Sequence, residues 1–150
     1  MALDGYSYST NDDFLSYEFE SVGPKGSIKK LVRFTARNAN GTTYFNLSFG
    51  DLDTNTGKID DKAVTDNQDR DRILATIAST VLDFTSIFPD IMVYATGSTP
   101  ARTRLYQIGI SANLEEIEAV LHVYGFNGSK WIPFERNINF DAFLVMRKLS

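Results

Sequence analysis

The sequence predicts an α+β protein with a single mixed, mostly antiparallel sheet and two main helices packed on it. Three patterns predict this class: strands separated by turn residues, two helical segments in the middle, and a hairpin followed by a closing strand. Eleven Phe, seven Tyr and one Trp also favour strands, because aromatic side chains fit a half-buried pleated surface. The expected order is β-β-β-α-β-α-(α)-β-β-β.

The first three strands are predicted as a meander. Residues 17–22 have strand character, Gly23-Pro24-Lys25-Gly26 forms a turn, and residues 28–37 continue with β-branched and aromatic residues. Asn38-Ala39-Asn40-Gly41 makes the next turn. Residues 43–49 then alternate in character, as a half-buried third strand should.

Two main helices follow an acidic loop. Residues 69–88 carry one narrow polar stripe in an otherwise apolar pattern, which predicts a largely buried helix ending before Pro89. Residues 91–96 form a short apolar strand. Thr99 is placed to cap a second helix with Pro100 at its first position, and this helix is expected to end at Gly109.

The last third returns to strands. Residues 113–118 suggest one more short helix, and residues 120–126 have strand character up to the Asn127-Gly128 turn. Residues 130–134 are expected to return beside that strand. Residues 140–147 supply the closing strand.

One domain is expected over residues 1–150, because this length suits a single core and no repeat or linker interrupts it. Residues 1–13, rich in Ser, Thr, Asn and Asp, predict a frayed lead-in. No secretory signal begins the chain, and no stretch reaches the roughly 20 apolar residues of a membrane helix. We therefore expect a cytoplasmic protein without membrane contact.

Composition removes several classes of chemistry. The absence of cysteine excludes disulfides, thiolate nucleophiles and cysteine-bound zinc. The only histidine, His122, lies in an apolar strand pattern, where a packed or hydrogen-bonded role is the better interpretation. No G-x-S-x-G turn supports a Ser-His-Asp triad. A formal net charge of -4 speaks against nucleic acid as a partner but leaves room for a local basic patch.

The acidic loop resembles a calcium loop at Asp51, Asp53 and Asn55, because hard cations prefer alternating oxygen ligands. The register does not fit, since glycine stands at the seventh place and Lys62 where a bidentate glutamate belongs. An ordinary loop is the better interpretation, and we expect no metal.

The strand-to-helix corner at residues 97–104 is the leading candidate site. Glycine allows close approach, a helix N-terminus favours anions, and guanidinium groups match phosphate or carboxylate. The candidate ligand-binding residues are Gly97, Ser98, Thr99, Arg102 and Arg104. Capping alone also explains Thr99, and two arginines that are two positions apart do not share a helix face.

A weaker candidate is a basic, aromatic sheet face around the first hairpin. Alternation places Lys29 and Arg33 on one face and Lys30 on the other. Such a face could bind single-stranded nucleic acid, but a strand edge protected by lysine is the preferred interpretation. The lone Trp131 is expected to be a core or rim aromatic.

The sequence resembles a family of small bacterial proteins of unknown function, mainly from Bacteroidetes. The resemblance rests on residues 19–26, 49–51 and above all 97–106, and it extends from residue 17 to residue 148. A family without an assigned activity implies no catalytic residues.

The order of elements is also similar to the acetyl-CoA-dependent N-acetyltransferase fold. Ala101, Leu105-Tyr106 and Gly109-Ile110 resemble its A-x-x-L-Y-x-x-x-G-F helix, with spacings that differ by one on both sides of the tyrosine. The resemblance implies that Tyr106 protonates a departing thiolate. Residues 66–71, which should hold a pyrophosphate, are acidic and lack glycine. We therefore expect no cofactor.

The leading hypothesis is a non-enzymatic binding or regulatory protein that takes an anionic ligand or a protein partner at residues 97–104. One alternative is a degenerate or divergent acyltransferase-like enzyme with Tyr106 as general acid. The other is a small toxin-like or nucleic-acid-acting member of a two-gene module. An open edge strand also leaves room for a homodimer.

Overall fold

The structure is a computed structural model that describes residues 3–60 and 66–149 of the chain. Its strands and helices follow the predicted order, with two very short strands in addition. The bounds are β1 Ser9–Thr10, β2 Ser16–Gly23, β3 Gly26–Ala39, β4 Thr42–Leu52, β5 Ile59–Asp60, α1 Arg70–Ile87, β6 Val93–Ala95, α2 Pro100–Ala112, α3 Leu114–Glu118, β7 Leu121–Phe126, β8 Trp131–Pro133 and β9 Ala142–Arg147.

In the described residues the strands form one sheet, in the order β1-β2-β3-β4-β6-β9-β7-β8, with β5 paired to β4. β4 and β6 are parallel, whereas the other pairs are antiparallel. The predicted fold class is therefore confirmed.

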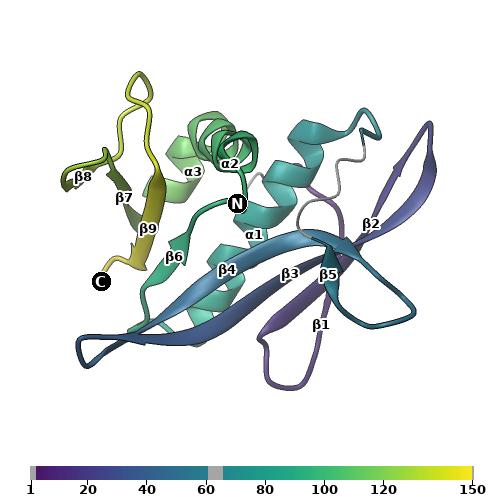
Figure 1. The fold of residues 1–150 in the computed structure, drawn as a ribbon, viewed down its shortest axis with the longest axis horizontal. Coiled ribbons are helices and arrows are strands. Elements are labelled where there is room, and N and C mark those ends of the chain that lie inside the picture. The colour runs from purple at the N-terminus through teal and green to yellow at the C-terminus, as the bar shows by residue number, and fades with distance from the viewer. Residues whose placement is uncertain (1–2, 61–65, 150) are drawn as a thin grey trace.

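The three helices lie together on one side of the strongly curved sheet (Figure 1). The ring of Phe84 on α1 is fully buried and stacks on Phe34 of β3, with 4.0 Å between the ring centroids. Phe45 of β4 and Phe88 also contact Phe84, at 5.3 and 5.2 Å. This aromatic cluster fixes α1 across the middle of the sheet.

Alternation along the strands separates a helix-covered face from an open face. On β3, Lys30, Val32 and Phe34 are buried toward the helices, and Lys30 is paired in register with Phe19 and Asp51. Lys29 and its register partner Glu20 occupy the open face instead. The predicted separation of Lys30 from Lys29 is therefore confirmed.

The second helix differs from its prediction, because α2 continues through Gly109 to Ala112. A β-carbon at Gly109 would lie 3.1 Å from Cβ of Leu74, so glycine here permits close contact between α1 and α2. The helix ends instead at Asn113, whose side-chain amide donates to the carbonyl of Gly109 at 2.8 Å. Gly109 therefore allows α2 to pack closely on α1 and does not end the helix.

The prediction of a frayed lead-in over residues 1–13 is wrong for the residues that the structure describes. The amide of Tyr6 donates to Oγ1 of Thr76 on α1 at 2.8 Å, and its hydroxyl donates to Asp69 at 2.6 Å. The hydroxyl of Tyr8 donates to Asp83, and β1 pairs with β2. The polar composition of this segment did not indicate these contacts. They depend on its tyrosines, because a tyrosine can bury its ring and still form a hydrogen bond through its hydroxyl.

These two tyrosines predict a loss of stability at alkaline pH. Burial, followed by the hydrogen bonds to Asp69 and Asp83, raises the pKa of Tyr6 and Tyr8 above the ordinary value of 10.0. Their stabilising effect is therefore complete below pH 10.0 and is lost as the pH rises through the raised values. Denaturant unfolding between neutral and alkaline pH should show this decline. It should be shallower in Tyr8→Phe, and parallel curves for the two proteins would contradict the assignment.

Candidate functional site

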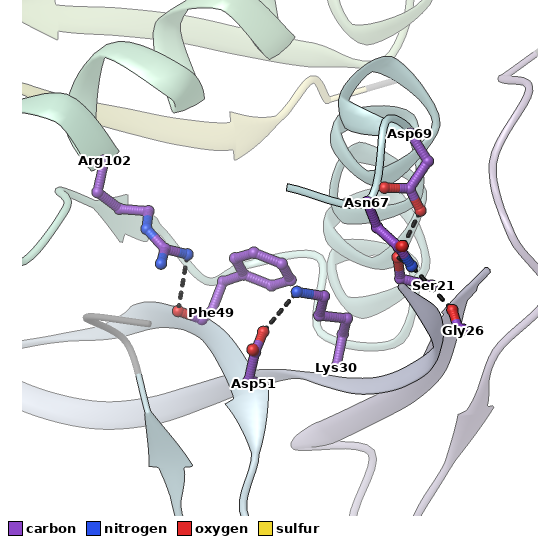
Figure 2. Close-up of polar contacts among 8 residues, drawn as sticks. All are labelled: Ser21, Gly26, Lys30, Phe49, Asp51, Asn67, Asp69 and Arg102. Atoms are coloured by element: carbon purple, nitrogen blue, oxygen red, sulfur yellow. Dashed lines mark hydrogen bonds and ion pairs between the residues drawn. The ribbon is translucent and has the colours of Figure 1, made fainter. Parts of the chain in front are cut away.

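A cleft of about 1220 Å³ lies between the start of α1, one side of α2 and the adjoining parts of β3 and β4. Figure 2 shows the polar side chains at its edges, with Arg102 on one side, the Ser21, Asn67 and Asp69 cluster on the other, and Lys30 between them. The topology creates the cleft, because α1 and α2 both begin at the same end of the parallel pair β4 and β6.

The α2 wall of the cleft is positively charged. It includes Thr99, Arg102 and Arg104, and no carboxylate of α2 faces the cleft. Thr99 caps the helix, since its Oγ1 accepts from the backbone amide of Arg102 at 3.2 Å. The dipole of α2 adds a partial positive charge at the same end. Thr99 and the two arginines, which the sequence singled out, therefore share one surface.

The side chain of Arg102 reaches across to the sheet. Its Nη1 donates to the carbonyl of Phe49 at 3.4 Å, and its guanidinium carbon lies 5.3 Å from the centroid of the Phe49 ring. Arg104, two positions after Arg102, is exposed and also lines the cleft. The expectation that these arginines diverge is thus only partly right: their contacts differ, but both border the cleft.

An ion pair forms the floor of the cleft. The ammonium of Lys30 contacts the carboxylate of Asp51 across the β3 and β4 pairing, and the exposed fractions of the two side chains are 5% and 20%. Phe19 stacks on Phe49 beside this pair, at 6.2 Å between centroids. Burying an ion pair costs desolvation energy that apolar residues would avoid.

The α1 wall is a hydrogen-bonded support. Asn67 is 2% exposed, and its side-chain amide donates to Ser21 at 3.1 Å and to the carbonyl of Gly26 at 2.9 Å. Asp69 accepts from the hydroxyls of Ser21 at 2.5 Å and Tyr6 at 2.6 Å. Both hydrogen bonds end on Oδ2, so they hold the carboxylate of Asp69 in place beside the cleft.

An apolar cavity of about 70 Å³ adjoins the cleft. Both spaces are lined by Leu74, Ile77 and Tyr106, and the cavity continues between the helices and the central strands toward Val93 and Phe143. Tyr106 is 7% exposed. The site therefore combines a charged opening with an apolar interior.

Nearly the whole chain matches one family model. The matching family is described as a family of unknown function, DUF6934, and the match spans residues 2–148. The chain is a DUF6934 protein. No curated protein and no solved structure matches it. The predicted resemblance to a family of unknown function is thus confirmed, and the family assigns no role to any residue.

In this DUF6934 chain, Gly97 and Ser98 do not line the cleft. The amide of Gly97 donates to Oγ1 of Thr103 at 2.9 Å, and a β-carbon at Gly97 would lie 2.4 Å from the backbone nitrogen of Thr103. Glycine is required here because the chain folds back against its own helix. The backbone amide of Gly97, which the sequence analysis considered as a donor to a ligand, donates to Thr103 within this turn.

The calcium-like loop of the DUF6934 chain serves other contacts. Asp51 pairs with Lys30, and Asp53 accepts from the amide of Asn55 at 2.9 Å. Positions 61 and 62 of this loop lie outside the described residues. Among residues 3–60 and 66–149, no group of three or more His, Asp or Glu side chains is arranged to hold a metal ion.

Sequence reasoning missed Lys30 and Phe49 as parts of the site. The available signal was alternation, which places Lys30 on the buried face of β3, opposite to Lys29. A lysine on a buried strand face requires a partner, and β4 supplies Asp51.

The helices of the described residues also lack the length and apolar character that crossing a membrane requires.

Proposed function

We propose that this DUF6934 protein is a binding protein whose cleft takes a small anion that carries an apolar part. The observation that carries the proposal is the α2 wall, which presents Arg102 and Arg104 without a carboxylate on the same helix wall. A cytoplasmic location belongs to the same proposal and is supported by the chain's lack of cysteine.

Charge supports an anionic ligand. A guanidinium donates up to five hydrogen bonds and can bind a carboxylate, sulfate or phosphate group with two of them. Arg102 donates from Nη1 to the Phe49 carbonyl at 3.4 Å, and the exposed Arg104 presents a second guanidinium at the cleft. The carboxylate of Asp71 on the opposite wall lies 3.4 Å from Arg70, which partly neutralises it.

Shape supports an apolar part in the ligand. Binding sites for small molecules are concave and mostly apolar, with a few charged groups that orient the ligand. Leu105 and Ile108 line the cleft next to the arginines, and Leu74 and Tyr106 continue this surface into the apolar cavity. A ligand held at Arg104 by its charged end would place its apolar end toward Tyr106.

A thermal-shift titration tests this proposal with sulfate, acetate and octanoate as probes. Octanoate should raise the melting temperature with saturation, because a ligand that binds the native state stabilises it by mass action. Arg104→Ala should weaken octanoate binding by roughly tenfold through the loss of a charged hydrogen bond. Arg136→Ala is the matched control, since this exposed arginine bonds the Ser111 carbonyl and does not line the cleft.

Two outcomes would contradict the proposal. One is the absence of any shift with all three anions. The other is an equal loss of binding in Arg104→Ala and Arg136→Ala, which would show that general positive charge, rather than the cleft, attracts the anion.

An acyltransferase-like enzyme is the second candidate. It is supported by the parallel β4 and β6 pair, which α1 connects, and by the position of Tyr106 at the boundary between cleft and cavity. The start of α1 weighs against it, because Asp66, Asp69 and Asp71 line the cleft where a pyrophosphate would need positive charge. Adding acetyl-CoA to the same titration separates the candidates: a saturable shift that is absent with octanoate would favour the enzyme.

A further inference from the structure

The open face of the sheet carries a row of aromatic rings. Tyr44 of β4 contacts Tyr94 of β6 at 5.8 Å between ring centroids, and Tyr94 contacts Trp131 of β8 at 6.1 Å. Trp131 contacts Phe126 of β7 at 5.4 Å. Tyr44 and Tyr94 alternate with Phe45 and Val93, which pack in the core, so the row lies on the face of the sheet opposite to the core.

The aromatic row remains partly accessible. Trp131 is 41% exposed, and Tyr44, Tyr94 and Phe126 are half-buried. Contacts between neighbouring rings stabilise these side chains on the sheet surface. They do not explain why several strands each place a large apolar ring on a face that no other element covers. A ligand that covers such rings would gain contact with little loss of side-chain freedom.

Charge on this face is one-sided. Strict alternation places Lys29, Arg33 and Arg37 of β3 on the open face, with Arg37 opposite Tyr44 in register. The open-face positions of β3, β4, β6, β7, β8 and β9, all of them described, contain no Asp or Glu. The whole chain has 19 acidic residues and a net charge of -4, so the part of the open face formed by these strands, without β2, differs in charge from the rest of the protein.

We propose that the open face binds single-stranded nucleic acid, with bases stacked on the row from Tyr44 to Trp131 and phosphates bound by Arg33 and Arg37. Single strands are recognised by exposed aromatic rings next to a positively charged track, because each base has a stacking face and each nucleotide carries a phosphate. Neither arginine has an ion pair within residues 3–60 and 66–149: Nε of Arg33 donates to Ser16 at 3.4 Å, and Arg37 donates to the Ala36 carbonyl at 3.4 Å.

The acidic side chains of β2 define the limit of this surface. Glu18 and Glu20 occupy the open face on β2, on the side of β3 away from β8, and Glu18 lies 3.8 Å from the ammonium of Lys29. A bound strand therefore runs from Arg33 toward β8 rather than toward β2. This orientation also favours a single strand over a duplex, since paired bases cannot reach the rings.

Trp131 supplies the direct measurement, because it is the only tryptophan in the chain. Titration with roughly 10-nucleotide oligo-U and oligo-dT should quench its fluorescence with saturation, whereas a duplex of the same length should not. Comparison of oligo-U with oligo-dT shows whether RNA or DNA is preferred. Affinity should fall with salt, with a log-log slope of about -1.4 for two contacted phosphates.

Variants place the binding site on the open face. Anisotropy of a labelled oligo-U should show about tenfold weaker binding to Trp131→Ala, as expected for one lost stacking contact. Arg37→Glu should weaken binding and reduce the salt slope by about 0.7. Lys25→Glu makes the same charge change on the exposed turn between β2 and β3 and should leave binding intact. Far-UV circular dichroism verifies that each variant is folded.

Several results would overturn the proposal: no quenching, equal binding of duplex and single strand, or equal loss of binding in Arg37→Glu and Lys25→Glu. Sedimentation provides a further check. A dimer that becomes monomeric in Trp131→Ala would assign the open face to a second copy of the chain and not to nucleic acid.

Discussion

Asp51→Ala should lower the free energy of unfolding by about 3 kcal/mol. The mutation leaves the ammonium of Lys30 on a buried strand face, where the lysine side chain is only 5% exposed. An ammonium without a nearby carboxylate in that position loses most of its hydration and gains nothing in return. Urea unfolding of the wild type and the variant measures the difference.

The double variant Lys30→Met/Asp51→Ala separates this effect from the loss of the other contacts of Asp51. Methionine has a similar length without the charge and can pack against Phe19 and Phe49. We expect it to recover most of the lost stability, because removing both charges is far less harmful than removing one. A double variant that is as unstable as Asp51→Ala would show that the ion pair is not the cause.

Phe84→Ala should cost about 4 kcal/mol of the free energy of unfolding. Its ring is 0% exposed and contacts Phe34, Phe45 and Phe88, so alanine leaves a cavity that the surrounding rings cannot fill without moving. Because this cluster holds α1 on the sheet, the loss should appear in urea unfolding as a lower midpoint with an unchanged slope.

The matched control is Phe126→Ala on the open face, where the ring is half-buried and contacts the ring of Trp131. It should cost clearly less, since less apolar area leaves the protein interior. Equal losses at the two positions would contradict the assignment of Phe84 to the centre of the core.

Local signals explain how far the fold could be predicted. Thr99 and Pro100 mark the start of α2 because one caps the backbone and the other has no amide to leave unsatisfied, and the structure begins the helix at Pro100. The polar stripe predicted α1, which runs from Arg70 to Ile87. Each of these elements depends on residues that are close together in the sequence.

Long-range contacts explain what could not be predicted. β9 enters the sheet between β6 and β7, and nothing in its own residues states which strands it will join. The contacts of Tyr6 lie 63 and 70 residues away in the sequence, at Asp69 and Thr76. A polar N-terminal segment with scattered tyrosines therefore looks like a frayed end until the helix that it contacts is placed.

The candidate site follows the same division. Thr99, Arg102 and Arg104 could be identified because capping and charge are local properties of α2. The cleft itself depends on where α1, β3 and β4 meet α2, so Lys30 and Phe49 were not assigned to it. The sequence does not distinguish two reasons for glycine at position 97, because a ligand and a closely packed helix both require the absence of a side chain.

The most direct test of the central claim is an NMR titration that follows the backbone amides as octanoate is added. We expect saturable shifts of Arg102, Arg104, Leu105 and Phe49, which border the cleft, and little change on the open face. The same titration of Arg104→Ala should require roughly tenfold more octanoate. Shifts confined to the open face, or none at saturating octanoate, would contradict a ligand site in this cleft.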